Sequence, residues 1–323
     1  MTANPLVSII IPAFNSAPHI EETLQSVRAQ TYPHFEVIIM DGGSTDGTVA
    51  IAQAWAGGDP RFKWFRQSDR ATCTPRVSAA RNEAVDASTG ELLAFLDADD
   101  IWFPEKLARQ VELFRQHPAV GLTFTNYYYW DGVRDLDLRY GPGNFPPNQP
   151  RTRLIYSCLY GMSSVMARRE IFRQANGFDE SIPAAEDWDL WLRLAENGLE
   201  TRGITEPMLR YRLHPGNASK QTIRTGENAI RLLEKNRDRW RFPADRGDFE
   251  RALQNERCKL ELARARQWLD TDPARVAPAM WRAWRLNPGQ FKWLWRWACA
   301  AWPPALGGGL TRAYAHRKLR AKF

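Results

Sequence analysis

Short apolar runs alternate with amphipathic stretches over the first hundred residues of the chain. Four of these runs have the length and the composition of buried strands: 7–11, 35–40, 62–65 and 92–96. Three other stretches place apolar side chains at helical spacing: 18–30, the segment from the turn-rich loop 41–48 to Ala56, and 77–87. Strands that alternate with helices predict βαβ units around a parallel sheet, which is an α/β fold.

The pattern changes in the middle of the chain. Pro104 stands where a further helix would begin, because proline favours the first helical position. Residues 121–160 show no regular period, so we expect little regular structure there. After them, 183–197 predicts an amphipathic helix and 207–213 predicts a strand.

A helical pattern continues from about residue 220 to the end of the chain. The expected breaks in it are Pro243, 272–273, Pro288 and 303–304. We therefore predict two domains: an α/β domain over residues 1–220 and a helical C-terminal region over 221–323.

Composition narrows the class of protein. The 323 residues include 44% hydrophobic and 25% charged side chains, which is typical of a folded globular chain. The run at 7–11 is too short for a secretory signal, and the four cysteines are widely spaced without a CxxC pair. We expect a cytoplasmic protein with neither a disulfide framework nor a zinc site.

Charge is distributed unevenly along the chain. Residues 1–220 carry 22 Lys and Arg against 27 Asp and Glu, whereas 221–323 carry 22 against 10. After Asp272 the chain has ten Lys and Arg, six tryptophans and no acidic residue. We therefore expect the two halves to have different partners.

A cluster of carboxylates directly follows the fourth apolar run. Asp97, Asp99 and Asp100 come after the strand 92–96, and ligands of open α/β sheets bind beyond the carboxyl ends of strands. Alternation along the chain directs Asp97 and Asp99 to the same side. A divalent cation would offset the repulsion between these carboxylates. The alternative is an acidic turn that caps the next helix.

Six motifs occur in a fixed order: 12–15 (PAFN), 41–46 (DGGSTD), 78–82 (SAARN), 95–100 (FLDADD), 177–180 (GFDE) with 186–194 (EDWDLWLRL), and 211–219 (YRLHPGNAS). From about residue 5 to about 220 the chain resembles the family 2 inverting glycosyltransferases. The resemblance implies a GT-A fold, which is a Rossmann-like domain with a mixed central sheet that binds a nucleotide sugar.

The resemblance implies a set of residues that bind the nucleotide-sugar donor: Pro12, Ala13, Phe14, Asn15, Asp41, Arg81, Asp97, Glu186 and Arg212. Asp41 would receive the base, and the first loop would pass beneath the base or the ribose. We favour these roles over the alternatives, which are that Asp41 closes a tight turn and that Arg81 is a solvated helix residue or pairs with Glu83 or Asp86. Residues 70–75 depart from the commonest family pattern.

The resemblance also implies a Mn2+ or Mg2+ cofactor. Asp99 would bind the metal between the two phosphates, and Asp97 would contact the ribose or a metal-bound water. His214 would be a third metal ligand or a phosphate donor, and its alternative is an exposed loop histidine. For Asp100 we expect a cap on the following helix.

Asp187 is the candidate catalytic base. Inversion in one displacement requires a carboxylate that takes the proton of the acceptor hydroxyl. Glu186, Asp187 and Asp189 lie at the beginning of the helix expected at 183–197, where the helix dipole also favours acidic residues. The family-like sequence that follows favours the catalytic interpretation.

Tryptophan and arginine alternate in the last fifty residues, at 281–285 and 291–297. Such a pattern is typical of a helix that lies on an anionic membrane surface. The alternatives are tryptophans that pack a helical subdomain and a site for single-stranded nucleic acid. We favour the membrane and expect no nucleic-acid partner.

The function we expect is inverting transfer of a sugar from a nucleoside-diphosphate donor, a UDP-sugar, to an acceptor hydroxyl. The acceptor would be a glycan or a lipid-linked molecule in cell-surface polysaccharide or glycolipid synthesis, with the enzyme peripheral at the inner face of the cytoplasmic membrane. A nucleotidyltransferase is the rival enzyme, although 12–17 lacks its glycine-rich basic loop. A degenerate transferase that serves as a membrane scaffold is the non-enzymatic alternative.

Overall fold

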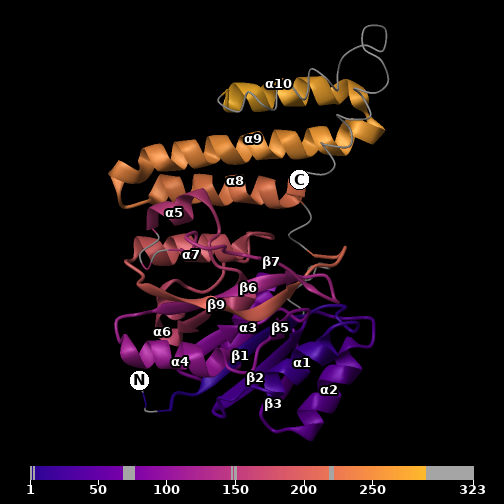
Figure 1. The fold of residues 1–323 in the computed structure, drawn as a ribbon, viewed down its shortest axis with the longest axis vertical. Helices are drawn as coiled ribbons and strands as arrows, with labels where there is room; N and C mark the ends of the chain where they lie inside the picture. Colours follow the sequence, from indigo (N-terminus) through magenta and orange to yellow (C-terminus); the bar gives the residue numbers. More distant parts are fainter. Residues whose placement is uncertain are drawn as a thin grey trace. The chain divides into compact units, whose positions relative to one another are not determined.

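The structure is a computed structural model, and it describes residues 2, 4–67, 77–146, 148, 151–217 and 222–288. The chain divides into two compact units, Met1–Asn217 and Ala218–Phe323. Strands and helices alternate through the first unit, and the described part of the second unit is helical (Figure 1).

Nine strands of the described residues form one mixed sheet in the first unit. They are β1 (Val7–Ala13), β2 (Phe35–Asp41), β3 (Phe62–Arg66), β4 (Leu92–Phe95), β5 (Ile101–Trp102), β6 (Leu122–Trp130), β7 (Asp135–Leu138), β8 (Met166–Arg168) and β9 (Thr201–Arg212). Their order is β3-β2-β1-β4-β8-β6-β9-β5, with β7 paired to β6. The strands β1 to β4 pair in parallel, whereas β8 and β5 are antiparallel to their neighbours. The mixed sheet confirms the predicted α/β fold class.

The helices of the first unit are α1 (Ile20–Arg28), α2 (Thr48–Gly58), α3 (Val77–Asp86), α4 (Lys106–Gln116), α5 (Arg151–Tyr156), α6 (Arg169–Gln174) and α7 (Glu186–Glu196). Ile20, Leu24 and Val27 of α1 are fully buried in the main core, as their spacing predicts. The first four strands and the first three helices lie where the sequence predicts them. The helix α4 begins two residues after Pro104.

The expectation of little regular structure over 121–160 is wrong, because the nine-residue strand β6 lies there. β6 lies between β8 and β9, and most of its side chains are buried on both faces. A strand covered on both faces shows no alternation of polar and apolar residues. The partner strand β9 begins at Thr201, six residues before Pro207, which lies at an irregularity in the β6–β9 register.

A buried polar network lies at the amino ends of β1, β2 and β4. The Glu36 carboxylate accepts hydrogen bonds from Ser8 Oγ at 2.8 Å, Lys63 Nζ at 2.8 Å and Thr89 N at 2.6 Å. Burial by itself would raise the pKa of Glu36, but these donors outweigh it and hold the pKa at about 2. A Cβ at Gly90 would lie 2.6 Å from Leu6 O, so only glycine fits beside this network.

The described part of the second unit contains α8 (Thr222–Arg239), α9 (Arg246–Thr271) and α10 (Val276–Leu286). The breaks expected at Pro243 and 272–273 are confirmed, because a short 3-10 helix begins at Pro243 and another at Pro273. The break expected at 303–304 and the tryptophans of 291–297 lie outside the described residues.

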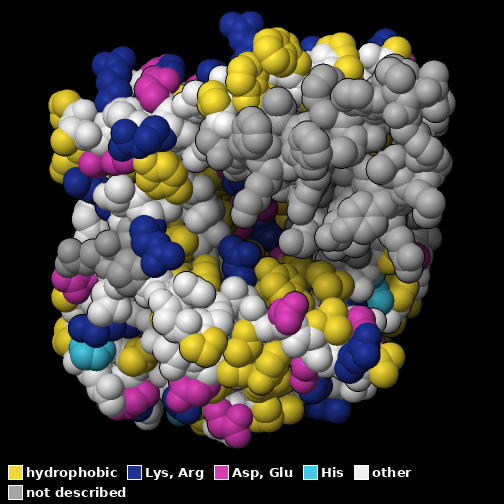
Figure 2. All heavy atoms as spheres, turned by 45° about the horizontal axis from the view of Figure 1, so that its top comes forward, with side chains coloured by type: hydrophobic (Ala, Val, Ile, Leu, Met, Phe, Trp, Pro, Cys, Tyr) yellow, Lys and Arg dark blue, Asp and Glu magenta, His cyan; other side chains and the backbone are white. Residues whose placement is uncertain are grey.

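Ion pairs join the helices of the second unit to one another. Arg257 of α9 pairs with Glu234 of α8 at 2.6 Å, and Arg282 of α10 pairs with Glu261 of α9 at 2.7 Å. Basic and acidic side chains also lie beside one another on the face of the molecule drawn in Figure 2. Much of the basic charge of the described helices is therefore matched by nearby carboxylates.

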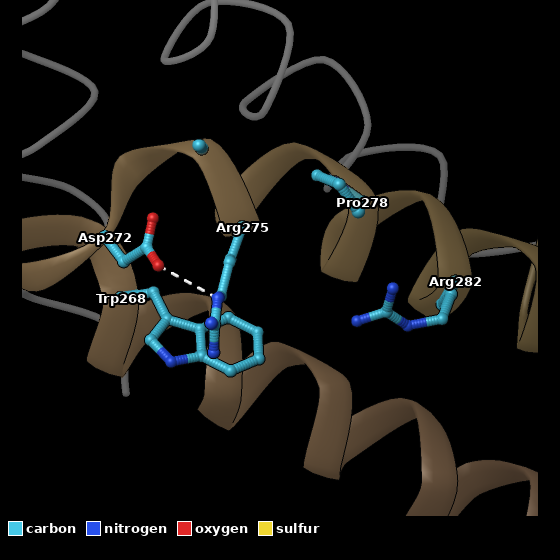
Figure 3. Close-up of a pocket in the computed structure, with 6 residues that line it drawn as sticks. Trp268, Asp272, Arg275, Pro278 and Arg282 are labelled. Atoms are coloured by element: carbon cyan, nitrogen blue, oxygen red, sulfur yellow. Dashed lines mark ion pairs between the residues drawn. The ribbon is translucent and has the colours of Figure 1, made fainter.

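A surface hollow lies between the end of α9 and α10 (Figure 3). Arg275 lies over the Trp268 ring, 5.6 Å from its centroid, and pairs with Asp272 at 2.9 Å. Because the charged groups of the hollow are paired within the protein, we interpret it as a helix junction. None of the described helices combines the length and the apolarity needed to cross a lipid bilayer.

Candidate functional site

The carboxyl ends of β1, β2 and β4 meet at one edge of the sheet. Ala13 and Asp41 are partners in the β1–β2 register, and Ile10 of β1 is the partner of Phe95 at the end of β4. The first loop (the loop after β1), the 41–48 loop and Asp97 therefore lie at the same edge, as the topology of a parallel sheet requires.

Hydrogen bonds join the first two loops. The Asn15 backbone N–H donates to Ser44 Oγ, and Thr45 N donates to Asn15 Oδ1, both at 2.9 Å. Asn15 has a φ of 48°, which a non-glycine residue rarely adopts and which is concentrated at functional sites. Phe14, 44% exposed, is one of the few large apolar side chains of the described residues that face solvent.

Asp41 closes the second loop. Its Oδ2 accepts hydrogen bonds from Gly43 N at 3.0 Å and Ser44 N at 3.1 Å, and the side chain is almost fully buried. Gly43 has a φ of 91°, which this tight turn requires. The structure thus gives Asp41 the turn-closing role, and its contact with a base stays a prediction.

The acidic loop, residues 97–100 after β4, is held by hydrogen bonds from several parts of the chain. The Asp97 N–H donates to Ser163 Oγ at 3.0 Å, and the side chains of Asp97 and Asp99 are partly exposed. Asp100 is completely buried, and its Oδ1 accepts the Arg212 backbone N–H at 2.9 Å. Burial, followed by the charges of Asp99 and Asp97, raises the pKa of Asp100 well above its usual range.

The expectation that Asp100 caps the following helix is wrong. The helix α4 begins at Lys106, and no side chain caps its first turn. The two-residue strand β5, which pairs with β9, separates Asp100 from α4. Asp100 instead fastens the acidic loop to the end of β9 through the Arg212 N–H.

Arg212 and His214 bring the end of β9 to the acidic loop. Arg212 Nε donates to the Asp99 carbonyl at 2.8 Å, and its guanidinium also pairs with Glu22. The same group lies 4.3 Å from the centroid of the Trp130 ring. Arg212 is therefore almost fully buried, with protein partners that position the acidic loop.

His214 contacts the Asp99 side chain directly, with Nε2 2.8 Å from Oδ2. The Gly216 N–H donates to His214 Nδ1 at 3.2 Å, so in the neutral ring Nδ1 is the acceptor and Nε2 carries the proton. In this arrangement His214 is a donor to Asp99. Metal ligation through Nε2 would require Nδ1 to release the Gly216 hydrogen bond and take the proton.

Burial, followed by the negative charge of Asp97, raises the pKa of Asp99. A cation is the group that relieves this repulsion, and two carboxylates suit a hard divalent ion. Within the described ranges, no group of three or more His, Cys, Asp or Glu side chains forms a ready metal shell. Asp97 pairs with Arg81 and Asp99 with His214, and the binding of a cation by these two carboxylates stays a prediction.

Arg81 joins the acidic loop to the beginning of α7. Its guanidinium is buried and donates to Asp97 Oδ1 at 2.8 Å and to Glu186 Oε1 at 2.5 Å. Arg81 thus pairs with Asp97 and with Glu186, two partners that the sequence alone did not indicate. The predicted residues Arg81, Asp97, Glu186 and Asp187 lie together.

The candidate base lies next to this ion pair. Asp187 is part-buried, and its Oδ1 accepts the Trp188 N–H at 2.8 Å. Burial, followed by the charge of Glu186, raises the pKa of Asp187 to about 7, although Arg81 acts in the opposite direction. Ala185, immediately before α7 and two residues before Asp187, has a φ of 62°, a strained conformation that directs the chain into α7.

Two of the sequence motifs interlock in space. Asn82 Nδ2 donates to the Phe178 carbonyl at 3.0 Å, and Phe178 N donates back to Asn82 Oδ1 at 2.9 Å. Gly177 has a φ of 65°, and a Cβ there would lie 2.7 Å from Asn82 Oδ1. These two motifs pack together beside Arg81, which contacts the Phe178 ring, so their contacts here are structural.

Sequence reasoning missed two residues that contact the site. Ser163 Oγ accepts the Asp97 N–H, and Cys158 Sγ lies 3.5 Å from Asp187 Oδ2. Both come from the segment between β7 and β8, where the sequence shows no periodicity. Only the fold brings them to the carboxylates, because β8 pairs with β4 and returns this segment to the site.

The sequence is similar to several glycosyltransferases. It is 33% identical over 211 residues to TuaG of Bacillus subtilis, named as a teichuronic acid biosynthesis glycosyltransferase, with 65% of this chain and 79% of TuaG covered. It is 31% identical over 216 residues to WfaP of Escherichia coli, a UDP-Glc:alpha-D-GlcNAc-diphosphoundecaprenol beta-1,3-glucosyltransferase, with 66% of this chain and 80% of WfaP covered.

Solved structures share the fold. TarS residues 1–349 of S. aureus, in complex with UDP-GlcNAc, superpose with a TM-score of 0.63 at 18% identity, covering 98% of this chain and 87% of that one. The mannosyltransferase PcManGT of Pyrobaculum calidifontis, in complex with GDP-Man and Mn2+, gives a TM-score of 0.61 at 22% identity, covering 99% and 87%.

The family described as Glycosyl transferase family 2 matches residues 8–174, which is more than half of the chain. The matched region contains the first two loops, Arg81 and the acidic loop, while α7 and the end of β9 follow it. This chain belongs to glycosyl transferase family 2 and is a GT-A-type glycosyltransferase.

Proposed function

We propose that this glycosyltransferase moves a sugar from UDP to an acceptor hydroxyl with inversion at the anomeric carbon. The observation that carries the proposal is the arrangement of Asp187, a part-buried carboxyl with a pKa of about 7, one ion pair away from the acidic loop. A base poised near neutral pH is suited to take the proton of an acceptor hydroxyl.

The donor lies, in this proposal, over the edge where β1, β2 and β4 end. The backbone of Pro12, Ala13, Phe14 and Asn15 passes beneath the base or the ribose, and Asp41 faces the base. The names of WfaP, with UDP-Glc, and of the TarS complex, with UDP-GlcNAc, support a uracil base. GDP-Man in PcManGT makes guanine the alternative.

Asp99 and Asp97 would hold Mn2+ or Mg2+, and His214 would join them only after Nδ1 releases the Gly216 N–H. The ion would supply positive charge against the diphosphate that departs. The Mn2+ in the PcManGT complex supports a divalent cofactor. Arg212 and Arg81 add fixed positive charge on two sides of the acidic loop.

Asp187 performs the acid–base step in this proposal. Its ionised carboxylate accepts the proton of the acceptor hydroxyl while that oxygen attacks the anomeric carbon from the face opposite the diphosphate. The negative charge of Glu186 keeps Asp187 basic enough for this, and Arg81 keeps Glu186 in place. The carboxyls needed for chemistry are all present, which argues against a degenerate scaffold.

The acceptor would be a glycan or a lipid-linked glycan in cell-surface polysaccharide synthesis. The names of TuaG and WfaP support this class of acceptor, since one names teichuronic acid and the other a diphosphoundecaprenol-linked sugar. A lipid-linked acceptor would place the enzyme at the inner face of the cytoplasmic membrane, held by the basic, tryptophan-rich end of the chain.

Asp99→Asn should abolish the Mn2+-dependent part of UDP binding, because the variant loses the charge that would bind the ion. Calorimetric titration with UDP, with and without Mn2+, measures this directly. Asp131→Asn, which changes a carboxyl in the turn between β6 and β7, is the matched control and should bind as the wild type does. Undiminished metal-dependent binding by Asp99→Asn would refute the assignment.

Asp187→Asn should lower turnover by about 10²- to 10⁴-fold, the usual contribution of a positioned base, and leave UDP affinity near that of the wild type. In the wild type, turnover should rise with pH through about 7, because the pKa of Asp187 is raised to about 7 and only its ionised form accepts a proton. Near-normal turnover in the variant would remove Asp187 from the mechanism.

A chain that ends at Pro288 should lose binding to vesicles of anionic lipid and keep its melting temperature and UDP affinity. It lacks seven Lys and Arg and four tryptophans of the terminal segment but keeps α10, whose Ala279, Met280 and Ala283 are buried. Co-sedimentation with vesicles at low and high salt measures the effect. Full-length protein that ignores anionic vesicles at low salt would contradict the membrane assignment.

A further inference from the structure

Cys158 has a part-buried thiol that the mechanism above does not use, and it lies against the proposed base. Its Sγ lies 3.5 Å from Asp187 Oδ2 and 3.6 Å from the Tyr160 carbonyl oxygen, and the charged carboxylate is the stronger acceptor of the two. The other oxygen, Oδ1, accepts the Trp188 N–H at 2.8 Å. Each carboxylate oxygen of Asp187 therefore has one donor, and the two donors fix the orientation of the carboxylate.

The backbone that carries this thiol is held by side chains of the loop after β7 and of α7. The Cys158 carbonyl accepts Arg139 Nη2 at 3.0 Å, the Leu159 carbonyl accepts the Tyr140 hydroxyl, and the Tyr160 carbonyl accepts Trp191 Nε1 at 3.3 Å. Three successive carbonyls thus accept three side-chain donors. The segment 158–160 is fixed more firmly than an ordinary loop between strands.

The segment 158–160 and the helix α7 contact each other at two points. Trp191, which donates to the Tyr160 carbonyl, lies four residues after Asp187 on the same face of α7. The helix therefore fixes the segment through Trp191, and the segment returns the Cys158 thiol to Asp187. A displacement of either element would change both contacts.

We propose that Cys158 is a positioning residue for the base Asp187: its thiol orients the carboxylate towards the acceptor hydroxyl. This inference rests on the proposed function of Asp187. A thiol is a weak donor, so it orients the carboxylate while withdrawing less of its basicity than a hydroxyl or a cation would. A weak donor therefore suits a carboxylate base, which must keep its affinity for a proton.

Several ionisable side chains of the described residues surround this contact. Glu186 and Arg81 face Asp187, and Arg139, Tyr140 and Tyr160 lie on or against the segment that carries the thiol. Burial, followed by the charge of Asp187, raises the pKa of the Cys158 thiol well above its usual range. The thiol therefore keeps its proton, and it remains a donor, at every pH at which Asp187 titrates.

Cys158→Ala should lower kcat by about three- to tenfold, which is the weight of one modest hydrogen bond, with UDP affinity unchanged. The acid limb of the kcat–pH profile should move to higher pH, because a donor that favours the ionised carboxylate is lost. Cys258→Ala is the matched control, since that thiol is buried away from the proposed site and donates to a carbonyl, Ala283 O, at 3.4 Å. It should leave kcat and the pH profile unchanged.

Cys158→Ser keeps a donor, so its acid limb should lie at or below that of the wild type. If Cys158→Ala does not fold, Cys158→Ser tests the proposal by itself. An acid limb above that of the wild type in Cys158→Ser would overturn the proposal. Superimposable profiles for Cys158→Ala and the wild type would overturn it as well.

A double-mutant cycle with Asp187→Asn separates positioning of the base from a general structural role. In the Asp187→Asn background, Cys158→Ala should change the residual turnover by less than about twofold, because the residue it serves is already absent. An equal loss in both backgrounds would refute the inference and leave the proposed function intact. Near-normal turnover in Asp187→Asn alone would instead refute the proposed function itself.

Discussion

The site depends on one buried guanidinium. Arg81 of α3 pairs with Asp97, sixteen positions later, and with Glu186, 105 positions later, while its own side chain is almost fully buried. A charge buried in this way is stable only with partners of opposite charge, and removal of one partner of such a pair typically destabilises a protein by about 3–5 kcal/mol. The ion pairs therefore fix the acidic loop after β4 and the beginning of α7 in one arrangement, with the proposed cation-binding and proton-accepting groups beside each other.

The basicity of Asp187 follows from the same arrangement. Burial and the charge of Glu186 raise its pKa, and Arg81 restrains the rise, with the result that the pKa lies at about 7. The charge of Glu186 thus acts to raise the pKa of Asp187, and the charge of Arg81 acts to lower it. The strained φ of Ala185, immediately before Glu186, is consistent with a site where the local backbone conformation serves the position of side chains.

The sequence predicts the strands with continuous apolar runs and the helix with one apolar face. The strands β1 to β4 and the helix α1 follow from these patterns, and the position of Asp97 and Asp99 follows from the strand that ends before them. β6 could not be predicted, because the buried polar residues Thr123, Thr125 and Asn126 interrupt its apolar run. The partners of Arg81 and the contact between Cys158 and Asp187 could not be predicted either, since they join residues that only the mixed order of strands brings together.

The most direct test of this account is the pH dependence of turnover in Arg81→Met, with UDP affinity measured alongside. Methionine fills much of the same volume without charge, so Asp97 and Glu186 lose their shared partner and Asp187 loses its restraining charge. The account predicts an acid limb that moves above the wild-type value near 7, together with weakened metal-dependent binding of UDP. An unchanged acid limb with unchanged UDP affinity would contradict it.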